Sequence, residues 1–298
     1  MKILRSKRGS ILILAALAFT AILGLAALVI DAGNLYMNRI QLATIADASA
    51  LAAARQLLTT TTETPAQAAQ ELATLNGKKS TDQLTVTINN HTVTVTASRK
   101  ITFLFAPLLG LTSSNVTASA TATTGVLGSA TGVVPFGIEQ KALTYGVSYV
   151  LKNGGGSGNT GNFGAVALGG SGANTYRENI ENGYSGTLHI GDKIYTEPGN
   201  MSGPTTTGVN YRITQDPTAT FPPSSNSPRI VTVPIVDSMD VNGRKQVTIV
   251  GFAAFFLEGV GGSGNNNYVT GQFIEMVQSG DLSTADTYYG VYNIKLTQ

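Results

Sequence analysis

Residues 1–31, MKILRSKRGSILILAALAFTAILGLAALVID, decide the fold of this chain. The four cationic residues of this stretch lie within its first eight positions, and no further charged side chain occurs before Asp31. A helix rises about 1.5 Å per residue, so the apolar run from Ile11 to Ile30 reaches roughly 30 Å, the thickness of a bilayer's hydrocarbon core. Because the cations flank one side only, residues 1–10 are predicted to stay in the cytoplasm. Everything after Asp31 is predicted to lie outside.

A cleaved secretory signal peptide has the same basic start and is the alternative interpretation. Its apolar region usually runs about 7–15 residues and is followed by a small-x-small cleavage site. The run here is longer, and the nearest candidate site, Ile30-Asp31-Ala32, is poor. We therefore interpret residues 11–30 as a retained transmembrane helix in contact with membrane lipid.

The composition excludes several classes of function. Among 298 residues there are 19 Lys and Arg, and setting aside the four N-terminal cations leaves 15 against 17 acidic residues. No basic stripe remains to neutralise phosphates, so nucleic-acid binding is not expected. Cysteine is absent, which excludes disulfides, thiolate metal sites and a cysteine nucleophile.

Helical spacing continues beyond Asp31 and predicts one helix from about Ser10 to Leu58. Its alanine-rich part, Ala43–Ala54, presents a small-residue face that we expect to lie on the chain's own sheet. A second, short helix is predicted at Ala66–Leu75, with Pro65 in its first turn.

Alternating apolar residues then predict a β-hairpin that turns at Asn89-Asn90, followed by a third strand at Val116–Thr124. Residues 31–125 therefore indicate a pilin-like module, a long helix packed on a small antiparallel sheet. Between the strands lies an apolar segment, Ile101–Leu111, which Pro107 interrupts and which is too short to span a membrane. It is either a packing loop or a contact with the bilayer surface.

Four motifs in the first part of the chain resemble a known family. They are RGS at 8–10, VIDAGNLY at 29–36, QL at 41–42 and ADASALA at 46–52. Together they resemble the TadG-like proteins (TadE/TadG family) of Tad/Flp pilus assembly. The resemblance is specific over about fifty-five residues and weaker through residue 125. It implies a single-pass envelope protein whose partners are other Tad pilus-assembly proteins.

Two departures from that family limit what the resemblance implies. Processed pilins of the system carry Glu five residues after the cleavage glycine, and counting from Gly9 this position is Leu14. Without a carboxylate there, the new amine of a cleaved neighbour has no buried partner, so a polymerising pilin cleaved at Gly9-Ser10 is not expected. The family's von Willebrand factor A-like domain needs Asp-x-Ser-x-Ser, which neither Asp237–Val241 nor Asp281–Ala285 supplies, so we expect no such domain.

The composition of residues 126–298 shifts to Gly, Asn, Tyr and Val, with several prolines. Strand-like runs separated by Gly and Pro turns predict an all-β domain, a sandwich or a barrel. These runs are Val133–Ile138, Tyr145–Leu151, Phe163–Leu168, Val209–Ile213, Ile230–Val236, Val247–Leu257, Val269–Met276 and Tyr288–Leu296. A short helix is predicted at Ala173–Gly183.

Candidate chemistry is sparse. His91 follows the hairpin turn, and His189 stands between two apolar neighbours, so both are interpreted as ordinary exposed side chains. Asp192 or Asp237 could join His189 in a triad, yet no Gly-x-Ser-x-Gly motif supplies the nucleophile.

The stretch Asp192–Thr205, which contains Glu197, has three open interpretations: a turn between strands, a partner-binding loop or a Ca²⁺ site. We predict no catalytic, cofactor-binding or metal residues and no cofactor.

The sequence thus predicts an α+β protein with four parts: a cytoplasmic segment (1–10), a transmembrane helix (11–30), a pilin-like module (31–125) and a β-rich extracytoplasmic domain (126–298). The predicted function is a non-enzymatic, structural role in Tad pilus assembly at the cytoplasmic membrane. The alternatives are an anchored ligand-binding protein or hydrolase, and a minor pilin or pseudopilin.

Overall fold

A computed structural model describes residues 8–58, 63–153, 163–283 and 287–297. The chain divides into two compact units. The first contains residues 1–123 and 295–298, and the second contains residues 124–294. Each unit is described by itself below.

Helix α1 (Arg8–Gln56) dominates the first unit and has 49 residues. From Ile13 to Ile30 its side chains are exposed except for half-buried Ala27, and burial begins at Asp31. The predicted helix is thus confirmed to within two residues at each end. In the part of the chain that the structure describes, α1 is the one helix long and apolar enough to cross a membrane.

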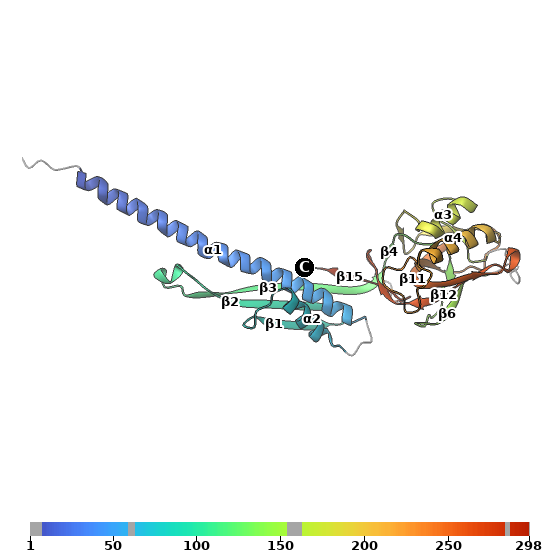
Figure 1. The fold of residues 1–298 in the computed structure, drawn as a ribbon, viewed down its shortest axis with the longest axis horizontal. Helices are drawn as coiled ribbons and strands as arrows, with labels where there is room; N and C mark the ends of the chain where they lie inside the picture. Colours follow the sequence, from blue (N-terminus) through green and yellow to red (C-terminus); the bar gives the residue numbers. More distant parts are fainter. Residues whose placement is uncertain (1–7, 59–62, 154–162, 284–286, 298) are drawn as a thin grey trace, which may run out of the picture. The chain divides into compact units, whose positions relative to one another are not determined.

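The C-terminal half of α1 packs on helix α2 (Pro65–Leu75) and on a sheet (Figure 1). Both helices bury alanines at the contact, including Ala50 and Ala54 on α1 and Ala69 on α2. Side chains this small let backbones approach closely, as the alanine-rich face predicted. A capping box between Thr64 and Gln67 begins α2.

The sheet of this unit is antiparallel, in the order β1 (Gln83–Asn89), β2 (Thr92–Thr102) and β3 (Ser113–Leu127). A 3₁₀ turn, η1 (Ala106–Leu109), lies between β2 and β3. The predicted hairpin and third strand are confirmed, although β3 is longer than predicted. Threonines line the outer face, where the Thr94 and Thr121 hydroxyls lie 2.9 Å apart. The C-terminus returns to this sheet, since the Thr297 amide donates to the Thr121 carbonyl.

The second unit is rich in short strands. Its larger sheet has the order β5-β10-β11-β12-β6, with β7 and β9 attached through β11. The strands that follow β3 along the chain are β4 (Ser129–Ala130), β5 (Ile138–Glu139), β6 (Ser148–Lys152), β7 (Val166–Ala167), β8 (Leu188–His189), β9 (Lys193–Thr196), β10 (Ile230–Val236), β11 (Gln246–Gly261), β12 (Tyr268–Ile274), β13 (Met276–Val277), β14 (Leu282–Ser283) and β15 (Val291–Leu296). A 3₁₀ turn, η2 (Gly264–Asn266), precedes β12.

Strand β11, which contains the predicted run Val247–Leu257, is the central strand of this unit. It pairs antiparallel with β10, β12 and β9, and it is buried from Gly251 to Leu257. Two hydrophobic clusters form the core, one containing Phe136 and Phe255 and the other Phe252 and Ile249. The α+β class is confirmed, with a β-rich C-terminal part.

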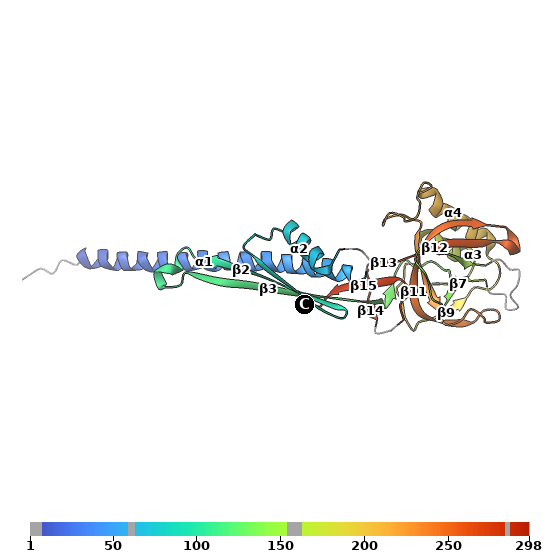
Figure 2. The same cartoon turned by 90° about the horizontal axis from the view of Figure 1, so that it is seen from below.

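Helix α3 (Ala173–Asn182) confirms the predicted short helix, whereas α4 (Ser202–Gln215) contradicts the strand predicted at Val209–Ile213. In α4, Thr205, Gly208 and Val209 are buried, at the i, i+3, i+4 spacing of one helix face. That face packs on α3 (Figure 2), where a Cβ at Gly208 would lie 2.8 Å from Ile180. Tertiary packing therefore outweighs the strand preference of the β-branched residues.

Candidate functional site

One buried carboxylate joins helix α1 to the β2–β3 hairpin in the first unit. Asp31, where the apolar run ends, is 3% exposed. Its oxygens accept hydrogen bonds from the backbone amides of Leu104 (2.8 Å), Phe105 (3.0 Å) and Ala106 (2.8 Å). Burial raises the pKa of this carboxyl, but the three amide bonds outweigh it and hold the pKa below its usual range. Asp31 therefore stays ionised and ties α1 to the end of the β2–β3 hairpin.

A second polar contact joins α1 to the sheet at Arg99 of β2. Its guanidinium binds both oxygens of Asp82, with Nε at 2.8 Å and Nη2 at 2.6 Å, and both side chains are almost fully buried. Nη1 donates to the side-chain oxygens of Asn38 (2.8 Å) and Gln41 (2.6 Å) on α1. One arginine thus crosslinks the helix, the sheet and the segment before β1.

Neither contact was predicted from the sequence, although the position of Arg99 in the alternating pattern of β2 indicates that its side chain is buried. Residues Val93, Val95 and Ala97 alternate on the buried face of β2, and Arg99 continues the same period. A cation on a core face needs a buried partner, and Asp82 is that partner.

The sequence-predicted candidates in the second unit do not form one site. His189 Nδ1 lies 3.6 Å from Asp192 Oδ2, and both side chains are largely exposed. Asp192 and Glu197 lie at opposite ends of β9. The carboxylate of Glu197 forms an ion pair with Arg244, whose Nη1 lies 3.4 Å from Oε2. Asp237 accepts bonds from the amides of Ser238 and Thr248 in a turn after β10. His91 is an exposed residue of the first unit.

The stretch Asp192–Thr205 is not one loop. Strand β9 occupies Lys193–Thr196, and α4 begins at Ser202. The interpretation as a single turn between strands was therefore wrong, because the four residues 202–205 enter a helix whose face packs on α3. Among the described residues no three His, Cys, Asp or Glu side chains gather closely enough to hold a metal ion. Whether the stretch binds a partner stays a prediction.

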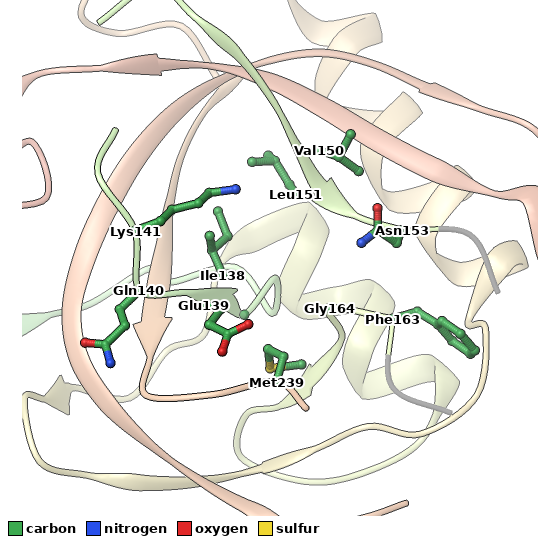
Figure 3. Close-up of a pocket in the computed structure, with 11 residues that line it drawn as sticks. Ile138, Glu139, Gln140, Lys141, Val150, Leu151, Asn153, Phe163, Gly164 and Met239 are labelled. Atoms are coloured by element: carbon green, nitrogen blue, oxygen red, sulfur yellow. The ribbon is translucent and has the colours of Figure 1, made fainter. Parts of the chain in front are cut away.

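A cavity of about 320 Å³ opens beside β5 and β6 (Figure 3). Its polar side chains are Glu139, Gln140 and Lys141 from β5 and the segment after it, and Asn153 after β6. Its described lining contains no serine, threonine or histidine, and its ionisable side chains are Glu139 and Lys141.

Lys152 lies in the chain between Leu151 and Asn153, which line this cavity, and its side chain is a buried cation, 1% exposed. Its Nζ donates to oxygens of Asn153, Asn200 and Asn267 at 3.2–3.4 Å. No ion pair to a carboxylate is present for it in the described parts of the chain. Burial lowers the pKa of Lys152 to about 8.

The second unit should therefore become more stable as pH rises from 8 toward 9.5. Between the folded pKa of about 8 and an unfolded value of about 10.4, the unfolded chain binds more protons, so the free energy of unfolding rises by about 2 kcal/mol. Urea unfolding at several pH values measures the slope. Lys152→Met should abolish it, and a slope kept in that variant would contradict the assignment. Measurements stop below pH 10 because burial raises the pKa of Tyr176, which acts in the opposite direction above that pH.

Comparison with known proteins bears on the helix that carries the Asp31 and Arg99 contacts. Residues 9–56 match the family model described as putative Flp pilus-assembly TadE/G-like. Over these residues the N-terminal helix is similar to the TadE/G-like family. The match covers α1 almost from end to end, from the exposed apolar run to the alanines buried on α2. No curated protein and no solved structure matches the chain.

The matched residues include Gly9 and Leu14, the two positions compared above with those of processed pilins. Gly9 lies in the first turn of α1. Leu14, at the position where the processed pilins have Glu, is an exposed apolar side chain, 63% exposed. It belongs to the same surface as the exposed apolar residues up to Ile30.

Proposed function

We propose that the chain is a TadG-like, single-pass protein of the cytoplasmic membrane that serves Tad/Flp pilus assembly without catalysing a reaction. Its N-terminus lies inside, and the pilin-like module and the β-rich unit lie outside. One observation carries the proposal: the TadE/G-like match covers a helix whose apolar half is exposed and whose other half is buried on the chain's own sheet.

Leu14 supports a tether rather than a subunit released for polymerisation, because processed pilins have Glu at this position, and the contacts of α1 are compatible with a tether. From Leu42 to Ala54 the helix buries its apolar face on α2 and β2, and Arg99 bonds Asn38 and Gln41. From Ile13 to Ile30, by contrast, only lipid would cover the exposed side chains. The β-rich unit then contacts other components of the pilus machinery by its surface.

The proposal is tested in the host by deletion and complementation. Loss of the gene should abolish surface pili, and the complete chain should restore them. Protease added to spheroplasts should digest the β-rich unit, and its protection would contradict the orientation. A membrane form that begins at Ser10 on N-terminal sequencing would instead favour a pilin subunit.

The anchored-hydrolase alternative makes an opposite prediction. His189→Ala, Asp192→Ala and Glu197→Gln together should leave pilus formation unchanged, because we assign these side chains no chemistry. Gln at 197 keeps the size of a residue that is buried beside Arg244. Loss of pili with normal protein levels and an unchanged urea midpoint would favour a chemical role.

A further inference from the structure

The turn between β2 and β3 exposes an unusual amount of apolar surface. We call residues 103–112, FLFAPLLGLT, the β2–β3 tip. Its exposed fractions are 69% for Leu104, 88% for Leu108, 79% for Leu109 and 59% for Leu111. No charged side chain occurs in the tip. Apolar patches of this kind on an otherwise threonine-lined sheet mark an interaction surface.

The backbone of the tip is suited to a medium poor in water. The amides of Leu104, Phe105 and Ala106 donate to Asp31, and Pro107 has no amide hydrogen. The tip's own carbonyls accept from the amides of residues 108, 110 and 111. Backbone donors at a membrane surface need such partners, because lipid tails offer none.

The position of the tip along α1 identifies its surroundings. Asp31 directly follows the exposed apolar run, so the amides that it binds lie where the hydrocarbon core ends. Both views show the β2–β3 tip beside α1, at the end of the sheet toward the N-terminal half of the helix (Figures 1 and 2). The tip that carries the exposed leucines is thus bonded to α1 at the level where the lipid-facing surface of the helix ends.

Two side chains near the tip are of types that are common in the headgroup layer of a membrane. Lys100, exposed on β2 just before the tip, could reach anionic headgroups. Tyr36 is 66% exposed on α1 and lies about 7–8 Å beyond Asp31 along the helix, within the headgroup layer where aromatic residues gather.

We propose that the β2–β3 tip inserts its leucines into the outer leaflet of the membrane that α1 spans and so forms a second membrane attachment beside the helix. This inference rests on the proposed anchoring through residues 11–30. A helix alone can rotate and tilt in a bilayer, whereas two attachments joined by Asp31 hold the pilin-like module in one orientation at the surface.

Single cysteines test the insertion directly, because the chain has none of its own. Leu108→Cys in the tip is compared with Leu25→Cys in the apolar run and Thr87→Cys on β1. Residue 87 pairs with Thr94, about 26 Å from the tip along β2. Each full-length variant carries a fluorophore and is reconstituted into vesicles of phosphatidylcholine and phosphatidylglycerol, three to one.

At position 108 we expect strong quenching by brominated lipid and several-fold weaker quenching by aqueous iodide than at position 87. Quenching at 108 by iodide but not by lipid, with position 25 still quenched by lipid, would overturn the insertion and leave the anchor standing. Loss of lipid quenching at position 25 as well would overturn both. If position 108 were instead protected from both quenchers, and the protection increased with the protein-to-lipid ratio, the tip would contact a second copy of the chain. That result would overturn the proposal.

Asp31→Ala then tests the link between tip and helix. With the carboxylate gone, lipid quenching at position 108 should fall while quenching at position 25 stays unchanged. Asp47→Ala, which removes a carboxylate higher on the same helix, is the matched control and should change neither. Unchanged quenching at position 108 in Asp31→Ala would show that the tip is not held by this contact.

Discussion

Replacing Phe19 and Leu23 together by arginine is expected to remove the protein from the membrane. Both side chains are exposed on α1, near the middle of the apolar run, at 64% and 54%. An arginine at the centre of a spanning helix costs about 2.5–3.5 kcal/mol, and each lost apolar residue adds a few tenths, so the pair opposes insertion by about 6–8 kcal/mol. Carbonate-washed membranes should then lack the chain.

The matched control places the same charges farther along the same helix. Thr44→Arg and Leu51→Arg fall on exposed positions of α1 beyond Asp31 and should leave the protein in the membrane fraction. If the Phe19 and Leu23 variant were also retained, the apolar run would not be the anchor. If the control were lost, the fractionation would be reporting misfolding rather than failed insertion.

Asp82→Ala should have the largest effect on the folding of the first unit. It leaves the Arg99 guanidinium buried with two amide oxygens and no carboxylate, and breaking a buried ion pair in this way typically costs about 3–5 kcal/mol. Hydrogen exchange of the β1 and β2 amides in the full chain should therefore accelerate by a factor of about 10² or more.

A rescue variant separates the charge from the packing. Replacing the pair by apolar residues, Asp82→Leu with Arg99→Met, removes the orphaned cation and should recover much of the lost stability. Lys100→Ala, next to Arg99 on the exposed face of β2, should leave exchange unchanged. Equal exchange rates in Asp82→Ala and the native chain would mean that Arg99 does not depend on this partner.

Local sequence patterns predicted the first unit well. The bounds of α1 follow from an apolar run joined to helical spacing, and the hairpin follows from strict alternation about Asn89-Asn90. These features were predictable because each depends on residues close together in the chain. The TadE/G-like resemblance lies within the same helix and was equally accessible, whereas the distinction between TadG-like and TadE-like proteins was not.

The second unit was predicted less completely. Strand β10 was found to the residue, since Ile230–Val236 is apolar except for Thr232 and is bounded by Pro228 and Asp237. Helix α4 was missed because its buried face, Thr205 to Val209, has only one large apolar side chain and depends on α3 for its burial. The side chain of Lys152 in β6 is hydrogen-bonded to Asn200 before α4 and to Asn267 just before β12, and no local sequence pattern connects these residues.

By itself, the sequence determined where the chain can enter a membrane, where its long helix begins and ends, and which pilus-assembly family the helix resembles. These properties depend on hydrophobicity and periodicity along one segment. Only the tertiary structure decided that Asp31 binds the β2–β3 tip and that Arg99 binds Asp82 and α1. Those contacts join residues up to 75 positions apart, and hydrogen bonds over such separations depend on how the elements pack.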